Sequence, residues 1–199
     1  MTANQKIPFA PGDTVPWFCA KASNNDKFFF DTVAGRYIVL SFLGSAGNPS
    51  INRFIDRLQQ KRSKYFDDKK CAFFGVSVDQ QDLAQERLKQ QVPGMRYFWD
   101  FDRKISELYT AIMDAPQGLN GPVVYRNFTL VLSPGLRVYA VVQNSDPDQH
   151  ADQLFSILDK LPIIPGAVPA VRQAPVLVLD NIFEPDFCRM LMDLYQEHG

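Results

Sequence analysis

The stretch YIVLSFLGSAGNPSINRFIDRLQQKRSKY, residues 37–65, decides the fold. Its first seven residues form an almost continuous apolar run between Gly35 and Gly44, which is typical of a strand buried on both faces. Ser50 is the expected N-cap of a helix that follows. The apolar residues of this helix recur at spacings of three, four and seven, at Ile51, Phe54, Ile55, Leu58 and Tyr65. The stretch therefore predicts a buried strand followed by an amphipathic helix.

A second strand and helix follow in the same order. CAFFGVSV (residues 71–78) predicts another buried strand, and DLAQERLKQQV (residues 82–92) predicts an amphipathic helix that ends at Pro93 and Gly94. Strands that alternate with helices of this length predict a parallel sheet with right-handed crossovers.

The pattern changes in the second half of the chain. A short connecting segment, YFWDFD (residues 97–102), precedes a helix expected over residues 103–112. Two strands then follow closely, FTLVLS (residues 128–133) and RVYAVVQ (residues 137–143). Their connection is too short for a parallel crossover, so they are expected to form an antiparallel hairpin.

Two further elements complete the expected order. Asp146 and Pro147 begin a last helix, and a short hairpin of VPWFCA (residues 15–20) and KFFFDT (residues 27–32) precedes the first buried strand. The inner face of the last helix is marked by Leu154, Phe155, Ile157, Leu158 and Leu161. This order predicts an α/β, thioredoxin-like fold, a three-layer sandwich with a central mixed sheet.

Composition restricts the function classes. The 199 residues include 21 basic and 22 acidic side chains, for a formal net charge of −1, so nucleic acid is not an expected partner. No apolar run approaches the roughly 18 residues that span a bilayer, and the N-terminus lacks the apolar region of a secretory signal. We therefore expect a cytoplasmic protein with no membrane partner.

The chain divides into three parts. Residues 1–161 contain every element of the expected sandwich. Residues 162–175, PIIPGAVPAVRQAP, have the composition of an extended linker. Residues 176–199 hold a possible strand, VLVLDNIF, and a helix that begins near Glu184 or Asp186. One strand and one helix cannot bury a core, so we expect this tail to be the beginning of a second domain.

Several segments of the first part resemble the successive landmarks of one protein family. The resemblance is to the alkyl hydroperoxide reductase/thiol-specific antioxidant (AhpC/TSA) family, the peroxiredoxins, and it covers roughly residues 10–160. The segments that carry it are GDTVPWF (12–18), YIVLSFL (37–43), GVSVD (75–79), FWDFDRKISELYTA (98–111) and FTLVLSPGLRVYAVV (128–142). The resemblance implies the peroxiredoxin type of the thioredoxin-like fold.

The family's active-site loop lies between the first core strand and its helix and carries a Pro-x-x-x-Thr-x-x-Cys motif. Its thiolate is stabilised at a helix N-terminus and attacks a peroxide oxygen to become a sulfenic acid. In this chain Gly44 stands at the proline, Asn48 at the threonine and Ile51 at the cysteine. We therefore expect a degenerate active-site loop made of Gly44, Asn48, Pro49, Ser50 and Ile51, with no catalytic residue assigned.

No other residue is an obvious replacement for the missing cysteine. The Ser50 hydroxyl is scarcely ionised at neutral pH and lacks an oxidisable sulfur. Cys19 and Cys71 are expected to be packing residues, and no Cys-x-x-Cys motif occurs. Arg126 lies near the family's catalytic arginine, but the best match places Asn127 there, so Arg126 is a candidate that we expect to be solvated or ion-paired.

A His-x-Asp triplet, His150 to Asp152, raises the question of a metal site with His198 as a distant ligand. The triplet falls in the first turns of a helix that we expect at the surface, whereas such ligands converge from a β-helix. We expect a polar helix start and no metal or other cofactor in this chain.

The tail APVLVLDNIFEPDFCRMLMDLYQ (residues 174–196) resembles the opening of the prolyl 4-hydroxylase-like 2-oxoglutarate/Fe(II) oxygenases. The resemblance implies that Cys188 packs a helix. It also implies that Fe(II) and 2-oxoglutarate are expected only if an oxygenase domain follows.

Two functions remain open. The first is a peroxiredoxin-like domain without peroxidase activity, which acts as a binding or accessory N-terminal domain of a longer oxygenase. Its partner would be an unidentified ligand or protein segment at the 44–51 loop, and the residues also allow a homodimer. The second is a thiol-dependent peroxidase that uses a non-standard cysteine.

Overall fold

The structure is a computed structural model. It divides the chain into two units, Met1–Ile164 and Pro165–Gly199. The linker expected over residues 162–175 and the strand expected over residues 176–183 lie almost wholly outside the described residues. The structure describes residues 8–23, 25–113, 124–143, 145–164 and 183–198.

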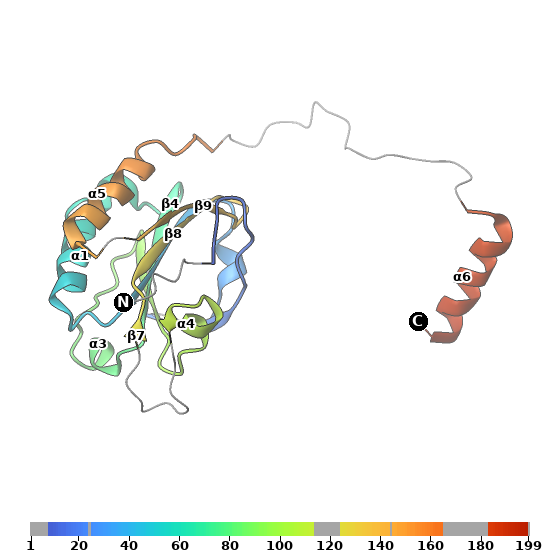
Figure 1. The fold of residues 1–199 in the computed structure, drawn as a ribbon, viewed down its shortest axis with the longest axis horizontal. Coiled ribbons are helices and arrows are strands. Elements are labelled where there is room, and N and C mark those ends of the chain that lie inside the picture. Colours follow the sequence, from blue (N-terminus) through green and yellow to red (C-terminus); the bar gives the residue numbers. More distant parts are fainter. Residues whose placement is uncertain (1–7, 24, 114–123, 144, 165–182, 199) are drawn as a thin grey trace, which may run out of the picture. The chain divides into compact units, whose positions relative to one another are not determined.

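The first unit is built on a mixed sheet of seven strands in the order β2-β1-β5-β4-β3-β8-β9 (Figure 1). Strands β3, β4 and β5 are parallel, and each other neighbouring pair is antiparallel. The strands are β1 Cys19–Ala22, β2 Asn25–Phe29, β3 Tyr37–Gly44, β4 Cys71–Ser77, β5 Met95–Trp99, β8 Phe128–Leu132 and β9 Val138–Val142. A separate pair joins β6 Ile112–Met113 to β7 Val124–Tyr125.

Helices cover both faces of the sheet. Helices α1 (Pro49–Gln60) and α5 (Pro147–Leu158) lie side by side on one face, and the 3-10 helix η1 (Phe30–Val33) and α4 (Lys104–Leu108) lie on the other (Figure 1). The expected three-layer, thioredoxin-like sandwich with a central mixed sheet is therefore confirmed.

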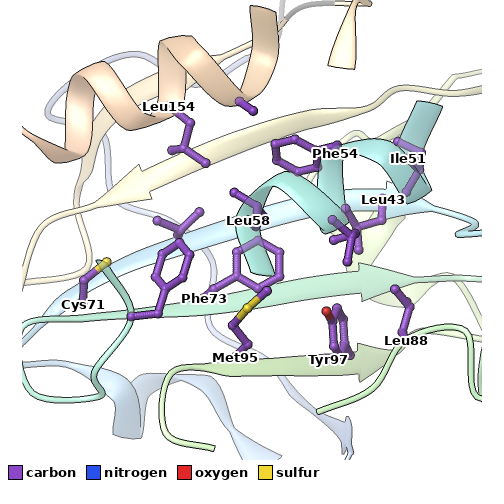
Figure 2. Packing of buried hydrophobic residues seen from close by; sticks show 14 of the residues in the cluster. Leu43, Ile51, Phe54, Leu58, Cys71, Phe73, Leu88, Met95, Tyr97 and Leu154 are labelled. Carbon is purple, nitrogen blue, oxygen red and sulfur yellow. The ribbon is translucent and has the colours of Figure 1, made fainter. Parts of the chain in front are cut away.

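Alternation along the strands explains the two cores. Val39 of β3 and Phe73 of β4 are register partners, and both belong to one cluster with Phe54 of α1 and Leu154 of α5. Figure 2 shows Phe73, Phe54 and Leu154 of this cluster. The neighbouring residues of both strands face the opposite cluster, which is rich in aromatic rings. In that cluster the Phe74 and Phe98 rings stack with centroids 5.2 Å apart. Both faces of β3 and β4 are thus buried, as their continuous apolar runs predict.

The first helix begins and ends differently from the expectation. Asn48, not Ser50, is the N-cap, because its side-chain oxygen accepts the Ser50 N–H over 2.9 Å. Pro49 then occupies the first helical position, where its missing N–H costs nothing. The helix expected to continue to Tyr65 is divided at Lys61 into α1 and a short α2 (Arg62–Tyr65).

The helix expected over residues 82–92 is wrong in length. Helix α3 spans only Gln80–Ala84, and Glu86 adopts a positive φ of 49°. After this turn Leu88 is buried in the core beneath α1. Of the apolar residues that suggested a longer helix, Leu88 therefore reaches the core from a loop, whereas Leu83 and Val92 are exposed.

Residues 97–102, for which no helix or strand was predicted, contain most of β5. This strand pairs in parallel with β4, with Gly75 opposite Tyr97. The helix expected over residues 103–112 is shorter than predicted, because Arg103 and Thr110 both have positive φ angles and bound α4.

The second unit contains helix α6 (Pro185–His198). Much of its apolar surface is exposed to solvent, through Phe187, Met190, Leu191, Met192, Leu194 and Tyr195. In the described parts of both units, no helix is long and apolar enough to cross a membrane.

Candidate functional site

The loop of residues 44–51 joins the end of β3 to the start of α1, at the carboxyl edge of the parallel strands. It begins at Gly44, which has a φ of +71°. A β-carbon built there would lie 2.9 Å from the Tyr125 ring. Both the backbone conformation and the close ring explain why glycine occupies this position.

Ile51 is part of the hydrophobic core. Its exposed fraction is 9%, and it belongs to the same cluster as Leu43 and Phe54 (Figure 2). The position expected to hold the nucleophile thus carries a branched alkyl side chain with no ionisable or oxidisable atom. This alkyl group stabilises the packing of the first turn of α1 against the sheet.

A buried carboxylate, that of Asp82, forms a hydrogen bond with the backbone of the loop. Asp82 of α3 has an exposed fraction of 0%. Its Oδ2 accepts the Ala46 N–H over 2.8 Å and the Ser77 hydroxyl over 2.7 Å. Its Oδ1 lies 3.4 Å from Nη1 of Arg87. Both oxygens of this carboxylate are therefore used in connecting β4, α3 and the loop.

A second carboxylate, Asp79, lies at the same place. The Ser45 hydroxyl donates to its Oδ2 over 2.6 Å, and Arg87 Nη1 lies 3.2 Å from that oxygen. Burial works to raise the pKa of Asp79, but the hydrogen bonds from Ser45 and from the Gln81 N–H, with the charge of Arg87, outweigh it. Its pKa lies below the ordinary value, so the carboxylate is ionised at neutral pH.

Four backbone N–H groups of the loop, those of Ala46, Gly47, Asn48 and Ser50, have acceptors within the chain. Besides Ala46, Gly47 donates to the Ser45 hydroxyl over 3.0 Å, and Asn48 donates to the Ser45 carbonyl over 3.3 Å. Ser50 donates to the Asn48 side chain. Two carboxylates and a self-capped helix start make this a poor environment for an added anion.

These three supporting residues, Asp79, Asp82 and Arg87, are absent from the sequence-predicted site. Asp79 follows a buried strand and caps α3, so its position at the carboxyl edge of the sheet was a usable signal. Arg87 reaches the two carboxylates because the chain turns after α3. The longer helix predicted over residues 82–92 does not contain this turn.

The structure separates the two candidates for the family's arginine position. The Asn127 amide donates to the carbonyl of Leu43 over 2.7 Å and to that of Phe42 over 3.2 Å, at the end of β3. Arg126 is buried, and its N–H donates to the Ala111 carbonyl over 2.7 Å. Of the two alternatives expected for Arg126, the solvated one is wrong because the side chain is buried.

The three cysteines lie in different environments. Cys71 is buried at the start of β4, and burial, with the negative charge of Asp67, raises the pKa of its thiol to about 12. Cys19 on β1 and Cys188 on α6 are exposed. Exposure of Cys19 contradicts the packing role expected for it.

The His-x-Asp triplet does not converge on a common point. His150 is buried, against the expectation of a surface position. Its Nε2 lies 2.9 Å from the Thr129 hydroxyl, and its ring meets Phe54 edge-on at 4.7 Å. Asp152 instead pairs with Arg57 at the surface. The described residues hold no group of three or more His, Cys, Asp or Glu side chains placed to bind a metal ion.

The strand order of the sheet, and the loop that connects β3 to α1, agree with the comparison with family sequences. The AhpC/TSA family model matches residues 11–136. The chain belongs to the AhpC/TSA family. A search of curated proteins found no match.

Several solved structures have a similar fold. Peroxidoxin BcpB from Mycobacterium tuberculosis matches with a TM-score of 0.60 and 18% identity, over 78% of this chain and 99% of that one. A mutant of PrxQ from Xylella fastidiosa matches with a TM-score of 0.62 and 15% identity, over 76% and 96%. Peroxiredoxin Q from Xanthomonas campestris matches with a TM-score of 0.54 and 17% identity, over 71% and 89%.

Proposed function

We propose that residues 1–161 form a peroxiredoxin-like binding domain that does not reduce peroxides by the family's thiol chemistry. The observation that carries the proposal is the buried Ile51 at the position of the nucleophile. Thiol-dependent peroxide reduction requires a sulfur that accepts an oxygen atom as the O–O bond breaks, and an isoleucine side chain has no atom that can do this.

The surroundings of the loop support the same conclusion. A reactive thiolate needs unpaired N–H donors or positive charge to lower its pKa. Here the Ala46 N–H is bonded to Asp82, and Asn48 caps the helix start. Arg87, the nearby cation, is paired with two carboxylates. The loop is thus stabilised as part of the fold.

What the loop offers to a partner is a small polar surface. Gly47, Asn48, Pro49 and Ser50 are exposed on a backbone that internal hydrogen bonds hold in place. Four of its N–H donors are used, and two carboxylates lie next to it. This surface therefore favours a neutral or basic protein segment over a small anion.

The test is a peroxidase assay on the purified chain. Hydrogen peroxide and an alkyl hydroperoxide are supplied in turn, with thioredoxin and thioredoxin reductase or with dithiothreitol, and peroxide loss is followed. We expect the rate of the reaction without protein, apart from slow oxidation of exposed thiols. Rapid turnover that alkylation of the thiols abolishes would overturn the proposal.

The second candidate, a peroxidase with a non-standard cysteine, is favoured by the exposure of Cys19 and Cys188. The same assay with Cys19→Ser and Cys188→Ser separates the two functions. If one variant loses a rapid peroxide turnover that the other variant retains, the peroxidase activity is assigned to the cysteine that was replaced in the inactive variant.

We further propose that this domain is the N-terminal accessory part of a longer 2-oxoglutarate/Fe(II) oxygenase. The support is the resemblance of residues 174–196 and the exposed apolar surface of α6, which an isolated helix has no means to bury. An antibody against residues 1–161 should detect, in the source cell, a protein much larger than 22.6 kDa. A single band at that mass would contradict the oxygenase.

A further inference from the structure

A cavity of about 130 Å³ lies at the amino ends of the parallel strands, the opposite edge of the sheet from the 44–51 loop. Its floor is apolar, because Ala72 and Phe74 of β4 are buried there beside Phe28 of β2. Its rim is charged, with Arg36, Asp68 and Arg96 around it.

The charges at the rim do not cancel. Arg96 binds the Asp68 carboxylate with both Nη atoms, over 2.6 and 2.7 Å, so this pair is closed on itself. Arg36 is different: among the described residues its guanidinium donates one hydrogen bond, to the backbone carbonyl of Asp68. One positive charge therefore remains at the rim, with most of its N–H donors available.

The aromatic rings define the other half of the cavity. The Phe28 and Phe74 rings lie 5.6 Å apart at a tilted angle, and the Arg96 guanidinium lies 5.9 Å from the centre of the Phe74 ring. Phe28 is partly exposed, whereas Phe74 is buried and its ring stacks on Phe98. A flat apolar group can therefore contact mainly the Phe28 ring while its charged end stays at the rim. A cavity of about 150 Å³ in another protein is large enough for benzene, so the volume here suits a body of one ring or a short alkyl chain.

We propose that this cavity binds a small organic monocarboxylate, with its carboxylate on Arg36 and its apolar body against Phe28, above the buried Phe74. A carboxylate matches the planar fork of a guanidinium and carries the single negative charge that the rim lacks. An inorganic dianion would match neither the apolar floor nor the single excess charge. The proposal is independent of the peroxidase question, because it involves none of the residues of the 44–51 loop.

The experiment is an NMR titration of the uniformly ¹⁵N-labelled full chain with sodium benzoate. We expect saturable shifts of amide signals from residues 28–36, 68–74 and 96, with a dissociation constant on the order of 1 mM, as befits a ligand of this size. Benzyl alcohol, which keeps the ring without the charge, and sodium sulfate, which keeps charge without the ring, should each bind about tenfold more weakly or worse.

Two variants test the assignment to the cavity. Arg36→Gln should weaken benzoate binding about tenfold or more, whereas Arg53→Gln, on the exposed face of α1, should leave it unchanged. Thr32→Phe fills the rim without altering any charge and should also abolish binding. Absence of saturable shifts, shifts located elsewhere, or full affinity in a folded Thr32→Phe variant would each overturn the proposal.

Discussion

The Asp82 carboxylate accepts the backbone N–H of Ala46 over 2.8 Å, and this bond joins α3 to the loop that follows β3. The same oxygen accepts the Ser77 hydroxyl, so one buried side chain satisfies two groups from different elements. In this family that loop is the expected catalytic site, and here it is anchored as a structural element.

Removing this anchor should destabilise the domain. In Asp82→Ala the Ala46 N–H and the Ser77 hydroxyl lose their buried acceptor, and Arg87 loses one of its partners. We expect the free energy of unfolding to fall by about 2–4 kcal/mol in urea titrations. The matched control is Asp56→Ala on the exposed face of α1, which should change it by less than about 0.5 kcal/mol. Equal effects of the two changes would refute the anchoring role.

Restoring the sulfur should not restore the chemistry. In Ile51→Cys the new thiol lies in a buried position beside an occupied helix start, so its pKa is expected above the ordinary value of about 8.5. The pH dependence of its alkylation, followed by mass spectrometry of the peptide, measures this pKa, and exposed Cys19 serves as the internal control. A pKa near neutrality with rapid peroxide consumption would show that the loop is still competent.

The native cysteines should divide into two classes. Cys19 and Cys188 are exposed, whereas burial raises the pKa of Cys71 to about 12. Titration with Ellman's reagent at pH 8 should detect two fast thiols in the folded protein and the third only after unfolding in guanidinium. Three fast thiols in the folded chain would mean that β4 opens readily.

Acid should weaken one particular ion pair. The hydrogen bonds of Arg96 lower the pKa of Asp68, against the effect of burial. Because the pKa of Asp68 is lower in the folded protein than in the unfolded chain, where it is about 3.9, the ion pair stabilises the folded protein at pH values above 3.9. This contribution is lost as the pH falls through the pKa of Asp68 in the folded protein. Arg96→Gln should therefore cost more stability at pH 7 than at pH 2.5 in urea titrations. An equal loss of stability at both pH values would contradict a stabilising ion pair between Arg96 and Asp68.

Local patterns were sufficient for the elements that the core requires. The apolar run of residues 37–43 and the helical spacing from Ile51 to Leu58 both match the structure, because burial and periodicity act within each segment. Strand β5 was missed because its aromatic residues, Tyr97 to Trp99, are consecutive and show no alternation with polar residues. Only its pairing with β4 identifies it as a strand.

The remaining differences depend on contacts between distant segments. His150 is polar and lies in the first turn of α5, yet it is buried. Its partner is Thr129 of β8, which also bonds Ser41 over 2.8 Å. Nothing near His150 in the sequence indicates that partner. The support of the 44–51 loop by Asp82 was likewise invisible, because its acceptor and donors come from three elements.

The most direct measurement is the second-order rate constant for reaction of the reduced, full-length chain with hydrogen peroxide, by stopped-flow with thiol quantification. With Ile51 at the nucleophile's position, the rate constant should lie within about tenfold of that of free cysteine at the same pH. A rate constant about a thousandfold above free cysteine, abolished by alkylation, would show that this chain retains a peroxidatic thiol and would contradict the account.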